Sequence, residues 1–219
     1  MNEARIEILE RIRSSLGGGQ PKPARIDRNY RVAGTRDSEA RIELLIDRLD
    51  DYDATVRRVP AADIGQAVSD FLDGAQSVVV PDEFPVQWLD TITSDGGGAE
   101  HPTILRDSAS NPLDIETVDT VDAVVTGSFV AIADTGTIVL VGNECGRRAI
   151  TLVPDHHVIV VRAADIVDIV PVGFRRIVDA GHDTAPITMV SGPSATVDIE
   201  FIRVHGVHGP RRLDVIIAE

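Results

Sequence analysis

Two carboxylates lie in short turns, beside glycines and hydroxyl residues. Asp134 precedes Thr135-Gly136-Thr137 between two apolar segments, and a carboxylate at that place could act as a general base. Glu144 follows the second segment, in Gly142-Asn143-Glu144-Cys145-Gly146, where a glutamate could be a nucleophile that carries an acyl group. Both stretches also have plain structural interpretations, as a hairpin turn and as a solvated loop, so both roles stay open.

A second turn, the Ser191 turn, reads Ser191-Gly192-Pro193-Ser194-Ala195-Thr196 and follows an apolar run that ends at Val190. Ser194 is placed to N-cap a helix that we expect to follow, and the free N–H groups at a helix start favour anions. The turn therefore predicts a site for a carboxylate or phosphate. Asp198 and Glu200 count against an anion there, unless they only complement the helix dipole. The candidate ligand-binding residues are Ser191, Gly192, Ser194 and Thr196, together with Thr135, Gly136 and Thr137 of the first turn.

A third turn, the His208 turn, reads Gly206-Val207-His208-Gly209-Pro210 and lies next to the pair Arg211-Arg212. Histidine beside arginine could bind an acid substrate and move a proton, so His208 is a further ligand-binding candidate. The simpler interpretation is a glycine turn with solvated basic side chains. The pair His156-His157 opens a strand, but no spacing supplies the additional ligand that a metal ion needs, so no metal site is predicted.

The charge balance excludes several classes of partner. The formal net charge is −14, from 35 acidic and 21 basic residues, and no basic stripe is present for nucleic acid or an anionic membrane surface. No apolar run approaches the roughly 18 residues that span a bilayer. The first residues are charged and lack the apolar stretch of a signal peptide. We therefore expect an acidic, cytoplasmic protein without membrane insertion.

Lysine and cysteine are too scarce for some kinds of chemistry. Lys22 is the only lysine and lies between two prolines, whereas a Schiff-base enzyme needs a lysine held in a pocket. Cys145 is the only cysteine, and an iron–sulfur cluster usually takes about four thiolates. We expect no cofactor on this chain. Any electrons must be carried by another protein.

The chain divides into a short N-terminal part, residues 1–35, and an α/β domain, residues 36–219. Residues 3–16 have apolar side chains at helical spacing and are followed by Gly17-Gly18-Gly19 and a polar linker. Such a helix cannot bury its apolar stripe alone. It packs on its own domain, on another copy in a homo-oligomer, or on a partner protein.

Strands alternate with helices in the domain, which predicts a mostly parallel sheet with helices on both faces. Close spacing between residues 121 and 141 indicates an inserted antiparallel hairpin. Because α/β sheets bind ligands at the carboxyl ends of their strands, we expect the three turns there. The expected strands are 55–59, 77–80, 121–126, 130–133, 137–141, 157–161, 187–190 and 213–218. One helix is expected to begin at Ser38 and another after Ser194, and further helices are expected over 63–72, 84–92 and 166–178.

Four motifs in a fixed order resemble the LUD (lactate utilisation) domain family, and specifically its small protein C branch. They are Ala131-Ile132-Ala133-Asp134-Thr135-Gly136-Thr137-Ile138-Val139-Leu140, Leu152-Val153-Pro154 with the strand 157–161, Ser191-Gly192-Pro193-Ser194 running into Asp198-Ile199-Glu200, and Gly206-Val207-His208-Gly209-Pro210. One departure is Asp134, where the family more often has glutamate, and the shorter carboxylate shifts its reach.

The resemblance implies a fold like that of ribose-5-phosphate isomerase, glucosamine-6-phosphate deaminase and the CoA transferases. It also implies a role with two iron–sulfur partner proteins in oxidising L-lactate to pyruvate. Together with the scarcity of cysteine and the Ser191 turn, it leads us to expect a non-redox subunit that binds a small anionic substrate. The alternative is a stand-alone acyl-CoA transferase or sugar-phosphate isomerase of the same fold, with Glu144 as nucleophile or Asp134 as base.

Overall fold

The computed structural model describes residues 3–17, 26–27, 29–93, 101–142, 145–197, 203–205 and 209–219. The chain forms two units, Met1–Arg31 and Val32–Glu219. The first unit contains the expected helix, α1 (Glu3–Ser15), and none of its residues is buried. No helix in the described part of the chain is long and apolar enough to cross a membrane.

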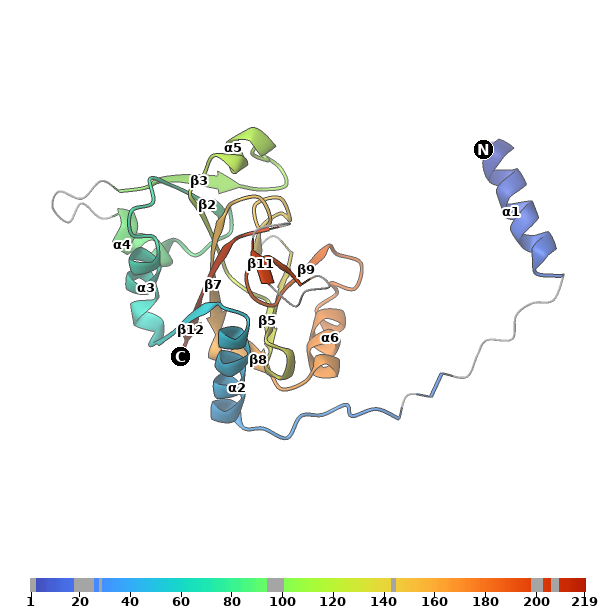
Figure 1. The fold of residues 1–219 in the computed structure, drawn as a ribbon, viewed down its shortest axis with the longest axis horizontal. Helices are drawn as coiled ribbons and strands as arrows, with labels where there is room; N and C mark the ends of the chain where they lie inside the picture. The colour runs from blue at the N-terminus through green and yellow to red at the C-terminus, as the bar shows by residue number, and fades with distance from the viewer. Residues whose placement is uncertain are drawn as a thin grey trace. The chain divides into compact units, whose positions relative to one another are not determined.

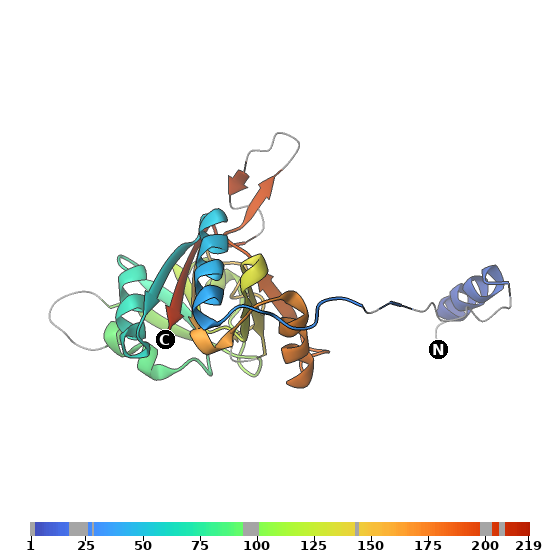
Figure 2. The same ribbon diagram turned by 90° about the horizontal axis from the view of Figure 1, so that it is seen from below.

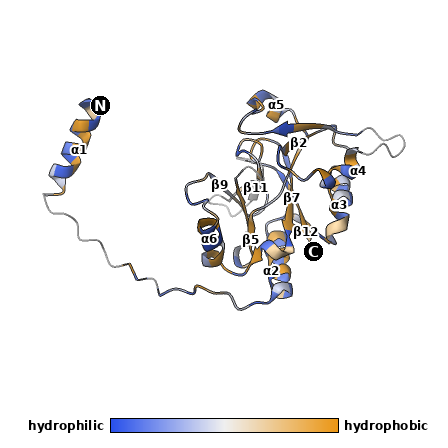
Figure 3. Ribbon diagram, turned by 180° about the vertical axis from the view of Figure 1, so that it is seen from behind, coloured by the Kyte–Doolittle hydropathy of each residue, from blue (hydrophilic) through white to orange (hydrophobic). Residues whose placement is uncertain are grey.

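The second unit is built on a parallel sheet of six strands in the order β1-β12-β7-β4-β2-β3 (Figure 1). Its middle strands consist mainly of buried valine and isoleucine, as expected for a parallel sheet covered on both faces, and Figure 3 shows the hydrophobic colour along β7. The strands are β1 (Thr55–Val59), β2 (Ser77–Pro81), β3 (Thr103–Asp107), β4 (Ala123–Thr126), β7 (His156–Arg162) and β12 (Arg212–Ala218).

Helices on the two faces of this sheet bury two separate cores. Successive residues of a strand point to opposite faces, so Val158 and Ile216 pack with α3 whereas Ile159 and Val215 pack with α2. The expected arrangement of helices on both faces is therefore confirmed. The helices of the whole unit, of which α6 lies on the second sheet described below, are α2 (Ser38–Asp51), α3 (Ile64–Phe71), α4 (Asp90–Thr93), α5 (Ile115–Asp119) and α6 (Val170–Asp179).

A second sheet, in the order β8-β5-β6-β9, contains the expected antiparallel hairpin. The hairpin is inserted between β4 and β7, whereas β8 and β9 come from the connection between β7 and β12. α6 packs on this sheet through Gly173, which lies so close to Ile132 that a side chain there would displace it. The strands are β5 (Val130–Ile132), β6 (Thr137–Val141), β8 (Ile166–Val167) and β9 (Ile187–Val190).

The helix expected after Ser194 is wrong. A strand, β10 (Ala195–Val197), begins there instead and pairs antiparallel with β11 (Arg203–His205), and the two extend from the domain in Figure 2. The β-branched pair Thr196 and Val197 favours a strand and outweighs the capping signal of serine. Asp198 and Glu200 lie outside the described residues.

Two further expectations need correction, and two elements were not expected at all. The helix expected over 166–178 begins only at Val170, with a proline in its first turn, because β8 occupies the preceding residues. The helix expected over 84–92 is a 3-10 turn, Val86–Trp88, followed by the short α4. The strand β3 and the helix α5 were not among the expected elements.

We expected the three turns at the carboxyl edge of the main sheet, but none of their described residues lies there. Residues 133–136 follow β5 and Ser191 follows β9, and both of these strands belong to the second sheet. The described end of the His208 turn, Gly209 and Pro210, precedes β12 and so lies near the amino-terminal edge. The chain leaves the main sheet to build the second one, and local patterns do not reveal which sheet a strand joins.

One buried carboxylate holds the segment that enters α2. Asp168, which follows β8, accepts hydrogen bonds from the backbone N–H groups of Thr35 (2.6 Å) and Arg36 (3.0 Å), and from the Arg36 guanidinium at 2.5 Å. Gly34 lies against the Asp168 side chain, where a Cβ would overlap it. Burial would raise the pKa of Asp168, but the hydrogen bonds from Arg36 and Thr35 outweigh it and lower that pKa.

We predict that Asp168→Asn lowers the free energy of unfolding by about 1–3 kcal/mol at neutral pH, since it removes a buried charged acceptor. Because the folded-state pKa lies below the unfolded value of about 4, this stabilisation is present above that value and is lost as the pH falls through the folded pKa. Urea unfolding of both proteins should therefore show their difference shrinking below about pH 4. The control is Asp47→Asn, which removes an exposed carboxylate of α2 and should change little. Equal effects of the two substitutions would contradict the prediction.

Candidate functional site

A chain of three hydroxyls joins the first turn to the Ser191 turn. The Oγ1 atoms of Thr135 and Thr137 are 2.8 Å apart, and Thr137 Oγ1 is 2.9 Å from Ser191 Oγ. The pairing of β6 with β9 places Ile138 opposite Val190, so the residues just outside that pair meet. The structure thus brings together hydroxyl residues that the sequence indicated in two separate places.

The glycines of these two turns are required by packing against the end of α2. Gly136 and Gly192 have φ angles of 62° and 93°, in the left-handed region that glycine adopts without strain. A Cβ on Gly136 would lie 2.7 Å from Arg48 Cβ, and one on Gly192 would overlap Tyr52. Close approach to a helix therefore explains both glycines, and neither is evidence of a ligand.

A small cavity, the Ser191 cavity, lies beside the Ser191 turn and has a volume of about 150 Å³. Its lining includes Ser191, Gly192, Ser194, His157 and Pro210, and extends from the end of β9 to the beginning of β7 and β12. The Ser194 N–H donates to the Pro210 carbonyl at 2.7 Å, which joins the Ser191 turn to the described end of the His208 turn. Two of the three predicted turns therefore contribute to one cavity.

His157 is the titratable residue of this cavity, and it is uncharged near neutral pH. Its side chain is buried, and its Nε2 lies 2.9 Å from Thr126 Oγ1. Burial, with a smaller effect from His156, lowers the pKa of His157 to about 3. The described lining contains no arginine or lysine. The cavity can therefore offer hydrogen bonds to a polar group, but no positive side chain to an anion.

A second polar cluster lies on the other face of the same strands. The buried carboxylate of Asp214 is 2.7 Å from His156 Nε2 and 2.8 Å from Arg212 Nη2. Burial opposes ionisation of Asp214, but these two partners outweigh it and lower its pKa. No group of three or more His, Cys, Asp and Glu side chains suits a metal ion within the described residues.

Of the two candidate catalytic carboxylates, only Asp134 is described by the structure, and it does not line the Ser191 cavity. Asp134 is 3.7 Å from Arg36 Nη1, and its N–H donates to the Asp168 carbonyl at 3.0 Å, so it belongs with the contacts that precede α2. Glu144 and His208 lie outside the described residues. Thr196 is described only as part of β10.

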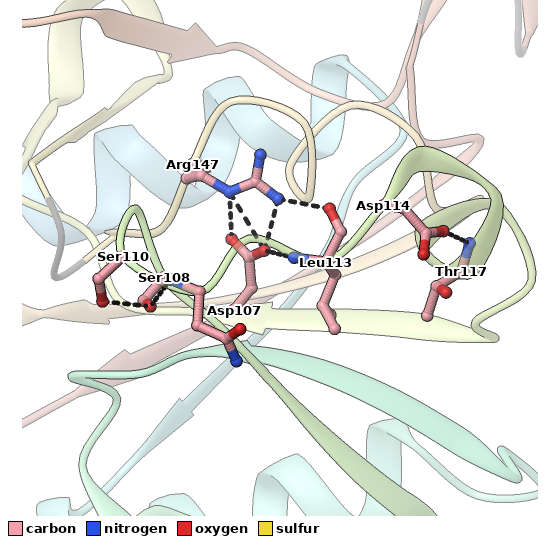
Figure 4. A network of polar contacts seen from close by, with 8 residues as sticks. Asp107, Ser108, Ser110, Leu113, Asp114, Thr117 and Arg147 are labelled. Carbon is pink, nitrogen blue, oxygen red and sulfur yellow. Dashed lines mark hydrogen bonds and ion pairs between the residues drawn. The ribbon is translucent and has the colours of Figure 1, made fainter.

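Sequence reasoning missed a buried ion pair at the end of β3 (Figure 4). Asp107 accepts hydrogen bonds from Arg147 Nε at 2.8 Å and Nη2 at 2.5 Å, and from the N–H of Leu113 at 3.0 Å. The hydrogen bond to Asp107 raises the pKa of Arg147.

A cavity of about 190 Å³ beside the pair is lined by Ser108 and Ser110, whose hydroxyls are 3.1 Å apart. Local patterns in the sequence could not indicate this pair, since its two partners lie 40 residues apart.

We predict that His157 makes stability depend on pH in mildly acidic solution. Its folded-state pKa of about 3 lies below the unfolded value of about 6.5. Between these values the unfolded chain binds one more proton, so stability falls as the pH is lowered, by at most about 1.4 kcal/mol per pH unit. His157→Gln should reduce this slope between about pH 6.5 and 4.5 in urea unfolding. His101→Gln, at an exposed histidine before β3, should keep the wild-type slope. An unchanged slope in His157→Gln would show the prediction to be wrong.

Comparisons with known proteins agree with the fold and with the resemblance. Lactate utilization protein C of Deinococcus radiodurans is 39% identical over 216 residues, which are 98% of this chain and 95% of that protein. Its counterpart in Shouchella clausii is 24% identical over 237 residues, with 100% of this chain and 99% of that protein covered. The crystal structure of a DUF162 family protein from D. radiodurans matches with a TM-score of 0.69 and 35% identity, over 84% of this chain and 100% of that one.

The family model for the LUD domain matches residues 42–218, a range that runs from α2 to the end of β12 and includes both sheets and all three turns. A match of that extent, together with a relative 39% identical along nearly its whole length, means that this chain belongs to the LUD domain family.

Proposed function

We propose that this chain is a non-redox subunit of a lactate utilisation system, and that it supports the oxidation of L-lactate to pyruvate together with iron–sulfur partner proteins. The observation that carries the proposal is the near full-length similarity to the D. radiodurans protein named lactate utilization protein C. The order of the four LUD motifs, from residue 131 to residue 210, supports it.

The electrons must leave lactate through another protein. Oxidation of L-lactate to pyruvate releases two electrons and two protons, so an acceptor is required. Cys145 is the only cysteine of the chain, and its side chain is buried in the core beneath α2. One buried thiol cannot replace the roughly four thiolates of a cluster. The proposed contribution of this chain is therefore to bind the substrate and the partner protein.

The stand-alone enzyme is not favoured by the geometry of any described residue. Asp134 lies beside an arginine, in the contacts that precede α2, and does not line the Ser191 cavity. The acyl-transfer role of Glu144 stays a prediction, since this residue lies outside the described part of the chain.

The proposed function includes binding of a small carboxylate ligand. The positions of positively charged side chains indicate where this ligand binds. An anion that leaves water needs hydrogen bonds and a positive partner. The Ser191 cavity offers the hydroxyls of Ser191 and Ser194, but the helix start that was to favour an anion there is a strand. We propose that this cavity takes an uncharged polar group, and that a carboxylate binds where a guanidinium is available.

We predict that a tagged copy of this chain, purified without oxygen from lactate-grown cells, co-purifies with an iron–sulfur protein and with lactate-dependent reduction of a dye. The same copy with Cys145→Ala should retain the iron content and the activity of the complex, because the buried thiol is not a cluster ligand. A copy that elutes alone and inactive, or an iron content that falls with Cys145→Ala, would count against the proposal.

A further inference from the structure

A third cavity, the Arg162 cavity, lies at the carboxyl ends of β2, β4 and β7, where parallel sheets bind their ligands. From β2 the chain continues outward to β3, whereas from β4 it continues to β7 on the other side. Neighbouring strands whose connections diverge in this way leave a crevice between the segments that follow them. The Ser191 cavity lies at the opposite end of β7, where it is lined by His157.

The Arg162 cavity has a volume of about 320 Å³ and a mixed polar lining. Glu83 follows β2, Gly127 and Ser128 follow β4, and Arg162 ends β7. Ser128 Oγ donates to the Val160 carbonyl at 3.1 Å, which fixes the segment after β4 against β7. Arg162, which can bind an anion, and Glu83, which can accept a hydrogen bond from a hydroxyl group, therefore line one cavity that is large enough for a small organic acid.

The guanidinium of Arg162 is positioned by an aromatic ring and has no carboxylate partner among the described residues. Its Cζ lies 5.3 Å from the centre of the Trp88 ring, in a cation–π arrangement. Trp88 is itself buried and packs edge-on against Phe84, with ring centres 5.4 Å apart. Arg36 and Arg147, by contrast, are both engaged by buried aspartates. Arg162 is thus a preoriented cation whose charge is available to a ligand.

We propose that the Arg162 cavity binds a small 2-hydroxy or 2-keto acid. The Arg162 guanidinium takes the carboxylate and the absence of a side chain at Gly127 leaves room for it. When the ligand is a 2-hydroxy acid, Glu83 accepts a hydrogen bond from its hydroxyl group. The assignment of a carboxylate site comes from the geometry of the cavity. The choice of hydroxy and keto acids among carboxylates rests on the proposed function.

The two cavities are alternatives for such a ligand. His157 of the Ser191 cavity and Arg162 are five residues apart along β7, which is roughly 16 Å in a strand. A three-carbon acid cannot reach both. Positive charge distinguishes the two cavities, because the described lining of the Ser191 cavity contains no arginine or lysine and that of the Arg162 cavity contains an arginine.

Trp88 is the only tryptophan of the chain, so its fluorescence reports on this cavity directly. We predict that sodium L-lactate and sodium pyruvate change the fluorescence of the full chain saturably at low ionic strength. Arg162→Gln should weaken their binding by about tenfold or more, since a charged hydrogen-bonding partner is lost. Arg162→Lys should weaken it less, because it keeps the charge but loses the two-pronged geometry. Calorimetric titration of the same proteins provides a second readout.

The control variants separate the cavity from general charge and from the rival site. Arg175→Gln removes an exposed guanidinium of α6 and should leave the affinity unchanged, as should Ser194→Ala in the Ser191 cavity. The proposal is overturned if neither acid binds, if Arg162→Gln binds as the wild type does, if Ser194→Ala alone weakens binding, or if inorganic phosphate is the only anion that binds. Circular dichroism of each variant confirms that it is folded.

This test is distinguishable from that of the proposed function. Binding of L-lactate by the isolated chain that depends on Arg162, without any co-purifying iron–sulfur protein, would support the cavity and contradict the subunit role. An active complex whose chain binds neither acid would support the subunit role and contradict the cavity.

Discussion

The burial of β7 and β12 on both faces is the constraint on which the rest of the domain depends. Successive residues of these strands enter two separate cores, so a polar side chain within them needs a partner or a place at a strand end. His157 and Asp214 meet that condition at the amino-terminal ends, where each is bonded to another polar side chain. Arg162 meets it at the carboxyl end, where it is exposed. Polar chemistry is therefore confined to two edges of the sheet.

Two arginines of this acidic chain are each paired with a buried aspartate. Asp107 and Asp168 are each buried at the end of a strand and each accept several hydrogen bonds, from Arg147 and from Arg36 respectively. Both pairs tie a segment to the domain and leave no net charge for a ligand. In a chain of net charge −14, such pairing makes an accessible cation in a cavity unusual, which is why the Arg162 cavity differs from the other two.

Local periodicity predicted most strands and helices, because β2, β7 and β12 are continuous apolar runs and α2 and α3 repeat apolar residues at helical spacing. It failed at Ser194, where a capping signal competed with β-branched residues, and at β3, which has few buried side chains. Local periodicity could not predict which side chains contact one another in the polar clusters and cavities. Arg36 and Asp168 are 132 residues apart, and Thr137 and Ser191 are 54 apart, so only the pairing of the strands brings them together. In the sequence, nothing distinguishes Arg162 from a residue at the end of any other strand. Only the order of the strands in the sheet shows that it lies beside the ends of β2 and β4.

The proposed division of labour between this chain and an iron–sulfur partner is consistent with the positions of Arg162 and Cys145. A chain with one buried cysteine can still orient a hydroxy acid, and an arginine that holds the carboxylate fixes where the carbon to be oxidised points. Arg162 and Glu83 are exposed, so the Arg162 cavity opens at the surface of the domain, where a partner can approach the bound acid. A substrate held in a closed core would be out of reach of an electron acceptor on another protein. On these grounds the carboxyl edge of the sheet is the place where a substrate site and a partner surface can coincide.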